Sequence, residues 1–214
     1  DEVNRASPKT QSALLEAMQE RSVTVDGVTR PLPDVFLTIA TQNPVESQGT
    51  YPLPEAQLDR FLFKVTIGHP DRSAERSILQ AHMGGFDPTR LENAGLATVT
   101  NAASIAAMQQ AVSQVQASPE LLDYLLEVIG RTRKHPSVEL GASPRAAVAL
   151  LAASRATAAI DGRDYVIPDD IKSCALPALR HRIMLQADAE FEGVSPDDVM
   201  RGILESVPVP RAAA

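Results

Sequence analysis

The feature that most limits the possible folds of this chain is a set of four Ser-Pro pairs. Each pair comes before a stretch with a helical residue pattern. A serine side chain caps the free amides of a first helical turn and proline fits the first helical position, so each pair predicts a helix start. The pairs are Ser7-Pro8, Ser118-Pro119, Ser143-Pro144 and Ser195-Pro196. We expect helices over 8–20, 71–83 and 102–114, from Ser118, from Ser143 to about Ile160, from Pro168 and from Ser195.

Three segments carry strand signals instead. In residues 22–30, SVTVDGVTR, valine alternates with threonine and Asp26-Gly27 suits the two positive-φ positions of a tight turn, which predicts a β-hairpin. The nearly unbroken apolar run VFLTIAT at 35–41 predicts a parallel strand that is covered on both faces. The alternating pattern FLFKVTI at 61–67 predicts an edge strand with one wetter face.

A stretch rich in glycine and proline marks a domain boundary. It runs over 84–100 and contains Gly84-Gly85 and Pro88. Glycine and proline are the strongest local breaks in regular structure. We therefore expect an α/β domain over 1–83, a connection over 84–100 and an all-α domain over 101–210.

Composition excludes some classes of protein. With 20 Lys and Arg against 27 Asp and Glu, the net charge is -7, which argues against a surface built mainly to bind nucleic acid. Cys174 is the only cysteine, so a disulfide framework or a cysteine metal cluster cannot form. No run approaches the roughly 18–20 apolar residues of a membrane span. We expect a cytoplasmic protein without a membrane span.

Five polar residues could carry chemistry. Asp1 and Glu2 are adjacent acids that could hold Mg²⁺ through one carboxylate and orient water through the other. Asn43 ends the predicted strand, and Arg60 and Arg145 lie near element starts. Each also has a simpler interpretation: a solvated acidic pair, a turn-forming asparagine, a surface ion pair for Arg60 and a solvated Arg145.

The order of the motifs resolves these alternatives. The segments DEVNRASPKTQSALLEAMQE, the Asp-Gly hairpin, ATQNP, YPLPEAQLDRF and GASPRA resemble, in register, the MoxR family of AAA+ ATPases. The resemblance extends from Asp1 to Pro210. It implies the fold class: the α/β part is part of an AAA+ P-loop NTPase core with an incomplete parallel sheet, and the all-α part is the helical AAA+ lid.

The resemblance also implies a role for each candidate residue. Asp1 ends the Walker B motif and would help to hold Mg²⁺ beside ATP, while Glu2 would polarise the attacking water. Asn43 is similar to sensor 1, which positions that water. Arg60 resembles the arginine finger that reaches a neighbouring subunit, and Arg145 resembles sensor 2 of the lid.

The family's activity sets the expected function and partners. We expect an ATP-dependent ATPase that remodels partner proteins or inserts cofactors, assembles into a homo-oligomeric ring, commonly a hexamer, and works with a protein that carries a von Willebrand A domain. The hairpin at 22–30 would face the ring's central pore. Two alternatives are a non-catalytic helical interaction module and a magnesium-chelatase-like ATPase subunit. Nucleic-acid translocation is not expected.

The P-loop signature GxxxxGK[ST] of this family does not occur in the chain. These 214 residues alone are therefore expected neither to bind nor to hydrolyse ATP. In the family sheet the P-loop strand separates the two predicted strands, so 35–41 and 61–67 would lie roughly 9.5 Å apart with unpaired edges. Because residue 1 is Asp and not Met, we expect the natural protein to begin before this residue.

Overall fold

The structure is a computed structural model, and it describes residues 1–43, 49–90 and 94–210. Most of the regular structure is helical. The helices are η1 Val3–Arg5 (a 3-10 helix), α1 Pro8–Glu20, α2 Glu55–Leu58, α3 Arg72–Met83, α4 Ala102–Gln114, α5 Pro119–Thr132, α6 Pro144–Ile160, α7 Pro168–Leu179, α8 Ala187–Phe191 and α9 Pro196–Ser206. The strands are β1 Ser22–Val25, β2 Val28–Pro31, β3 Val138–Leu140 and β4 Met184–Leu185.

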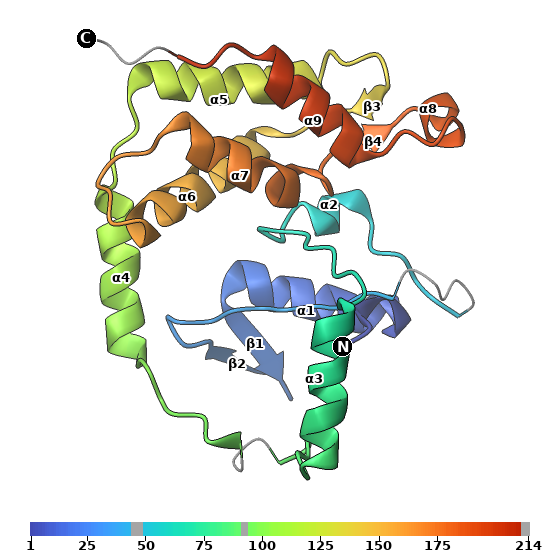
Figure 1. Ribbon diagram of the computed structural model, residues 1–214, viewed down its shortest axis with the longest axis vertical. Coiled ribbons are helices and arrows are strands. Elements are labelled where there is room, and N and C mark those ends of the chain that lie inside the picture. Colours follow the sequence, from blue (N-terminus) through green and yellow to red (C-terminus); the bar gives the residue numbers. More distant parts are fainter. Residues whose placement is uncertain (44–48, 91–93, 211–214) are drawn as a thin grey trace.

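The elements form two groups with α2 between them (Figure 1). α5, α6, α7 and α9 pack together at one end, with β3, β4 and α8 beside them. α1 and the β1–β2 hairpin form the other group, and α4 runs along one side of the molecule. No helix in the described ranges is long and apolar enough to cross a membrane.

Serine capping explains where four of the helices begin. The side chain of Ser7 accepts a hydrogen bond from the amide of Thr10 at the start of α1. The serines before α5, α6 and α9 make the same bond, and proline follows each of them. The helices predicted over 8–20, 71–83 and 102–114 and those predicted from Ser118, Ser143, Pro168 and Ser195 are confirmed.

The predicted hairpin is also confirmed. β1 and β2 pair antiparallel, and Asp26 and Gly27 connect them with φ angles of 51° and 76°. Two positive φ angles give a type I′ turn, whose twist matches that of the flanking strands. Val25 and Val28 face each other at the last pair of the ladder and are more than half exposed.

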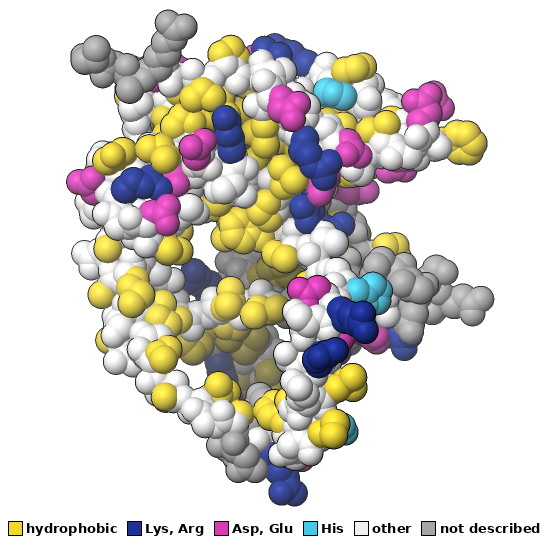
Figure 2. Space-filling view, viewed as in Figure 1, with side chains coloured by type: hydrophobic (Ala, Val, Ile, Leu, Met, Phe, Trp, Pro, Cys, Tyr) yellow, Lys and Arg dark blue, Asp and Glu magenta, His cyan; other side chains and the backbone are white. Residues whose placement is uncertain are grey.

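The strands predicted over 35–41 and 61–67 are not formed, so that prediction was wrong. The described residues contain two sheets, β1–β2 and β3–β4, and both are antiparallel pairs. A strand needs a partner for its backbone groups, and among the described residues no strand pairs with either segment. Leu37 is 78% exposed and Ile67 is 90% exposed, although the pattern predicted burial of the first segment. Figure 2 shows apolar side chains exposed on both groups and around the hollow between them.

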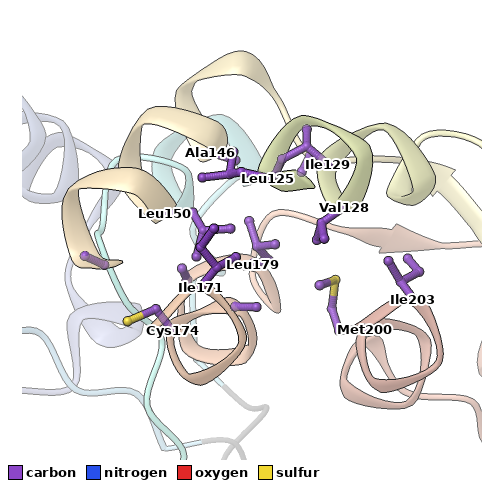
Figure 3. Packing of buried hydrophobic residues seen from close by; sticks show 14 of the residues in the cluster. Leu125, Val128, Ile129, Ala146, Leu150, Ile171, Cys174, Leu179, Met200 and Ile203 are labelled. Atoms are coloured by element: carbon purple, nitrogen blue, oxygen red, sulfur yellow. The ribbon is translucent and has the colours of Figure 1, made fainter. Parts of the chain in front are cut away.

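The α5–α9 group has the larger core (Figure 3). Its side chains come from all four long helices of the group. They include Leu125, Val128, Ile129, Ala146, Leu150, Ile171, Leu179, Met200 and Ile203, each at most 3% exposed. Complete burial of a large aliphatic side chain contributes roughly 1.5–3 kcal/mol, so this core can hold the helical group together.

A small apolar cluster supports the candidate site residues in the other group. Val3, Leu15 and Leu53 are buried together, and Leu58 and Phe61 pack against them. The buried Gln11 side chain donates hydrogen bonds to the carbonyls of Val3, at 3.1 Å, and Tyr51, at 2.9 Å. The cluster therefore ties the segment after Glu2 to the segments on both sides of α2.

Candidate functional site

The acidic pair is held by a threonine from the predicted sensor segment. Thr41 Oγ1 donates a short hydrogen bond to Asp1 Oδ1 and accepts one from the Glu2 amide at 2.9 Å. The Thr41 carbonyl also accepts from the Val3 amide at 2.9 Å. The Glu2 carboxylate pairs with Arg5, with 3.1 Å between Oε2 and Nε. The end of the 35–41 segment therefore lies directly beside both acids.

Asn43 follows Thr41 by two residues and is half-buried. The Thr41 contacts therefore bring the segment that contains Asn43 to the acidic pair. Glu2 has a left-handed backbone conformation, with φ at 46° and ψ at 52°, which is uncommon for a residue with a side chain. Sequence reasoning did not single out Thr41, since no local pattern reveals a contact 40 positions away.

Asp1 offers an oxygen ligand of the kind that Mg²⁺ prefers. No group of three or more His, Cys, Asp or Glu side chains in the described ranges could hold a metal ion alone. Mg²⁺ in nucleotide sites is usually bound through one or two carboxylates together with waters and substrate phosphates. The exposed Asp1 carboxylate, held through Oδ1 by Thr41, fits that limited role.

A second group of site residues gathers around the Asp59 carboxylate, immediately after α2. Arg182 Nε donates to Asp59 Oδ1 at 2.8 Å, and Ser143 Oγ donates to Oδ2 at 3.3 Å. Arg145 Nη1 lies 3.8 Å from the same Oδ2. Arg60 is the next residue in the chain. The structure thus brings Arg145 to the carboxylate of the residue that precedes Arg60 in the chain.

Two nitrogens of the Arg60 side chain have no acceptor among the described residues. Its Nε and Nη1 atoms are buried and make no hydrogen bond in the described part of the protein. A buried charged donor without a partner is costly, so an acceptor from outside these residues would stabilise it.

A close backbone contact fixes the loop before Arg145. A Cβ atom at Gly141 would lie 2.6 Å from the Arg133 Cα, so only glycine fits there. The Ala142 amide donates to the buried Thr132 Oγ1 at 3.0 Å, and Arg133 Nε donates to the Ala142 carbonyl at 2.8 Å. These bonds anchor the first turn of α6, and Arg145 projects from it with its side chain 56% exposed.

His181 lies beside this second group. Its Nε2 is 3.0 Å from the Phe61 carbonyl, which can only accept, so Nε2 carries the proton. Burial lowers the pKa of the His181 imidazole to about 4, and the hydrogen bond to Phe61 opposes this shift only in part. His181 is therefore neutral at pH 7.

The acids and the arginines form two separate groups. Neither Asp1 nor Glu2 makes a hydrogen bond or an ion pair with Arg60 or Arg145, and all four residues are described. The first group surrounds Thr41 and the second surrounds Asp59. Within one chain, the acids are thus held by Thr41, and Arg145 is held by Asp59.

Comparison with known proteins matches each of the two parts of the chain to a known protein family. Residues 1–63 match the ATPase family associated with various cellular activities (AAA), and residues 130–203 match the AAA lid domain. The chaperone MoxR1 of Mycobacterium tuberculosis is 41% identical over 100% of this chain, which covers 57% of the chaperone. The chain belongs to the MoxR family of AAA+ ATPases.

Other relatives agree with this assignment. The protein YeaC of Bacillus subtilis, described as uncharacterized, is 49% identical over 98% of this MoxR-family chain and 64% of its own length. A crystal structure of a candidate ATPase from Cytophaga hutchinsonii superposes with a TM-score of 0.87 and 38% identity. That comparison covers 99% of this chain and 65% of the other. The MoxR-family chain thus spans less than two thirds of each of these relatives, and it has the AAA+ fold with a helical lid.

Proposed function

We propose that the full-length protein hydrolyses ATP with Mg²⁺ and uses the energy to remodel partner proteins or to insert cofactors into them. AAA+ family membership implies the use of nucleotide and Mg²⁺, and the relative MoxR1 is named a chaperone. In this proposal the two domains are the AAA+ core over 1–83 and the lid over 101–210, joined by 84–100. We place the protein in the cytoplasm.

Each group of residues has its own part in the proposed reaction. Asp1 helps to hold Mg²⁺, Glu2 polarises the attacking water and Asn43 positions that water. Arg60 neutralises charge that develops on the transferred phosphoryl group, and Arg145 senses the γ-phosphate from the lid. Phosphoryl transfer depends on this kind of positioning and charge neutralisation more than on covalent chemistry.

The observation that carries the proposal is that Thr41 holds the acids and Asp59 contacts Arg145, with no bond from either acid to Arg60 or Arg145. The acids of one chain make no bond to its own Arg60, which supports a role for Arg60 in the site of a neighbouring subunit. We propose a homo-oligomeric ring, a hexamer, in which Arg60 acts between subunits. An arginine supplied from outside is worth about 10³ to 10⁵ in rate, so a monomer is nearly inactive.

The hairpin supports a contact with the client protein. Val25 and Val28 at its tip are exposed, and neither belongs to the apolar cores of the described residues. We propose that this tip faces the central pore of the ring. The partner that brings clients would carry a von Willebrand A domain, as the resemblance to the family implies.

Replacement of Glu2 tests the proposed catalytic role. In the full-length protein, Glu2→Gln keeps the side-chain shape and removes the base, so we expect turnover to fall by about 10²-fold or more while ATP still binds. The matched control is Glu16→Gln, an exposed acid on α1. Unchanged turnover in Glu2→Gln would instead favour the non-catalytic interaction module.

A further inference from the structure

Arg182 is a buried arginine between the lid and the segment that carries Arg60. Its side chain is only 2% exposed, and it lies three residues beyond the end of α7. Burial lowers the pKa of its guanidinium, and the hydrogen bond to Asp59 opposes that shift. An arginine in this position remains charged and needs acceptors for its five N–H donors.

Nearly all of these donors are directed at the three residues that surround Arg60 in sequence. Arg182 Nε donates to Asp59 Oδ1 at 2.8 Å, and Nη2 donates to the Asp59 carbonyl at 2.9 Å. Nη2 also donates to the Phe61 carbonyl at 2.7 Å, and Nη1 donates to the Leu62 carbonyl at 3.1 Å. The remaining bond joins Nη1 to the Ala178 carbonyl of α7.

These hydrogen bonds hold the backbone on both sides of Arg60, and none of them involves the Arg60 side chain. Asp59 and Phe61 are its immediate neighbours, and one nitrogen of Arg182 binds both of their carbonyls. Such a grip fixes the direction in which the Cα–Cβ bond of Arg60 leaves the chain. We propose that Arg182 is a positioning residue that sets the reach of Arg60, an inference that rests on the proposed role of Arg60 in ATP hydrolysis.

The Asp59 carboxylate links the Arg182 contacts to Arg145, a second arginine of the lid. Asp59 binds Arg182 through Oδ1, and its Oδ2 faces Ser143 and Arg145. A change in the angle of the lid at Arg145 therefore acts on the residue next to Arg60. Lysine cannot replace this arrangement, because one ammonium group lacks the planar fork that binds a carboxylate and four carbonyls.

The first test compares two arginines that each bind a carboxylate, in the full-length protein. We expect Arg182→Lys to lower kcat by about tenfold or more, since a small misplacement of a catalytic group can cost about 10²-fold, with the KM for ATP changed by less than about twofold. The control is Arg163→Lys. Arg163 makes bonds of 2.8 and 2.7 Å to the buried Asp170 within the lid and none to residues 59–62, so both constants should stay within about twofold.

The second test separates positioning from a general loss of structure. A subunit with Arg182→Lys keeps its own acids but presents a misplaced Arg60, whereas a Glu2→Gln subunit has an inactive site and an intact Arg60. Mixed rings should therefore turn over ATP faster than the sum of the two separate variants. A general structural defect in Arg182→Lys would not be rescued by the partner subunit.

The mixture of Arg60→Ala with Glu2→Gln distinguishes failure of this inference from failure of the proposed function. If that mixture gains no activity, the action of Arg60 between subunits is overturned, and the inference with it. If it gains activity while Arg182→Lys keeps the kcat of the unaltered protein or is not rescued, only the positioning role is overturned.

Asp59→Asn provides the test if Arg182→Lys does not fold. This change keeps the side-chain shape and removes the charge that Arg182 Nε binds. We expect a lower kcat and rescue by Glu2→Gln subunits. A kcat equal to that of the unaltered protein, or a loss that Glu2→Gln subunits do not rescue, would overturn the positioning role.

Discussion

At the scale of single residues, the contact between lid and core is built from buried polar groups. Arg182 and His181 both bond to the backbone around Arg60, and both are less than 10% exposed. A buried group that loses its partner, or gains a charge it cannot share, costs more free energy than a surface group. This part of the protein should therefore respond strongly to small chemical changes.

Because His181 is buried and neutral, we expect the protein to lose stability in mild acid. Its pKa is about 4 in the folded state and about 6.5 in an unfolded chain, so the unfolded state takes up the proton first as the pH falls. The free energy of unfolding should fall between about pH 6.5 and pH 4, by on the order of 3 kcal/mol in total. Urea unfolding measured across this range checks the expectation.

The matched variants are His181→Gln and His69→Gln. Glutamine can still donate to the Phe61 carbonyl but does not titrate, so His181→Gln should flatten the pH dependence in this window. His69 is exposed, so His69→Gln is the control for a histidine replacement at the surface. An equally steep loss in His181→Gln would assign the effect to other groups.

At the scale of elements, we expect one added methyl group in the loop before α6 to lower the stability of the protein. Gly141→Ala places a Cβ atom 2.6 Å from the Arg133 Cα and backbone nitrogen, so the backbone must shift. We expect a loss of about 1–3 kcal/mol in the free energy of unfolding. Gly130→Ala is the control, because a Cβ there meets nothing within 4 Å and alanine favours a helix. Equal stability of both variants would contradict this packing.

Elements whose signals are local could be predicted from the sequence. The serine caps and the Asp26-Gly27 turn depend on bonds within a few residues, so their sequences specify them. The prediction of strands at 35–41 and 61–67 was wrong because a strand depends on a partner strand, which a local sequence pattern does not reveal. The short strands β3 and β4 and the helices α2 and α8 were missed, since a few residues show no period.

Only the residues of the candidate site that belong to a sequence motif could be predicted. The motifs marked Asp1, Glu2, Asn43, Arg60 and Arg145. They did not reveal that Thr41 holds the acids or that Arg182 holds the segment of Arg60. The Arg182 contact joins residues 123 positions apart, which a motif of a few residues cannot encode. The division of the site into two groups likewise became visible only in the structure.

At the scale of the whole molecule, these 214 residues should not bind ATP by themselves. They contain no GxxxxGK[ST] motif, and the amides, lysine and hydroxyl of that motif supply most contacts to the phosphates. Isothermal titration of the isolated chain with Mg-ATP should give no measurable heat of binding. A micromolar affinity would show that other residues of this chain bind the phosphates.

The ring arrangement is the central claim about the whole molecule, and the ATP turnover of full-length Arg60→Ala tests it most directly. Arg76→Ala, which removes an exposed arginine on α3, is the matched control. We predict that Arg60→Ala lowers kcat by about 10³-fold or more and leaves nucleotide binding and ring assembly intact, because the arginine acts on a neighbour's phosphate. Turnover equal to that of the Arg76→Ala control would contradict the claim.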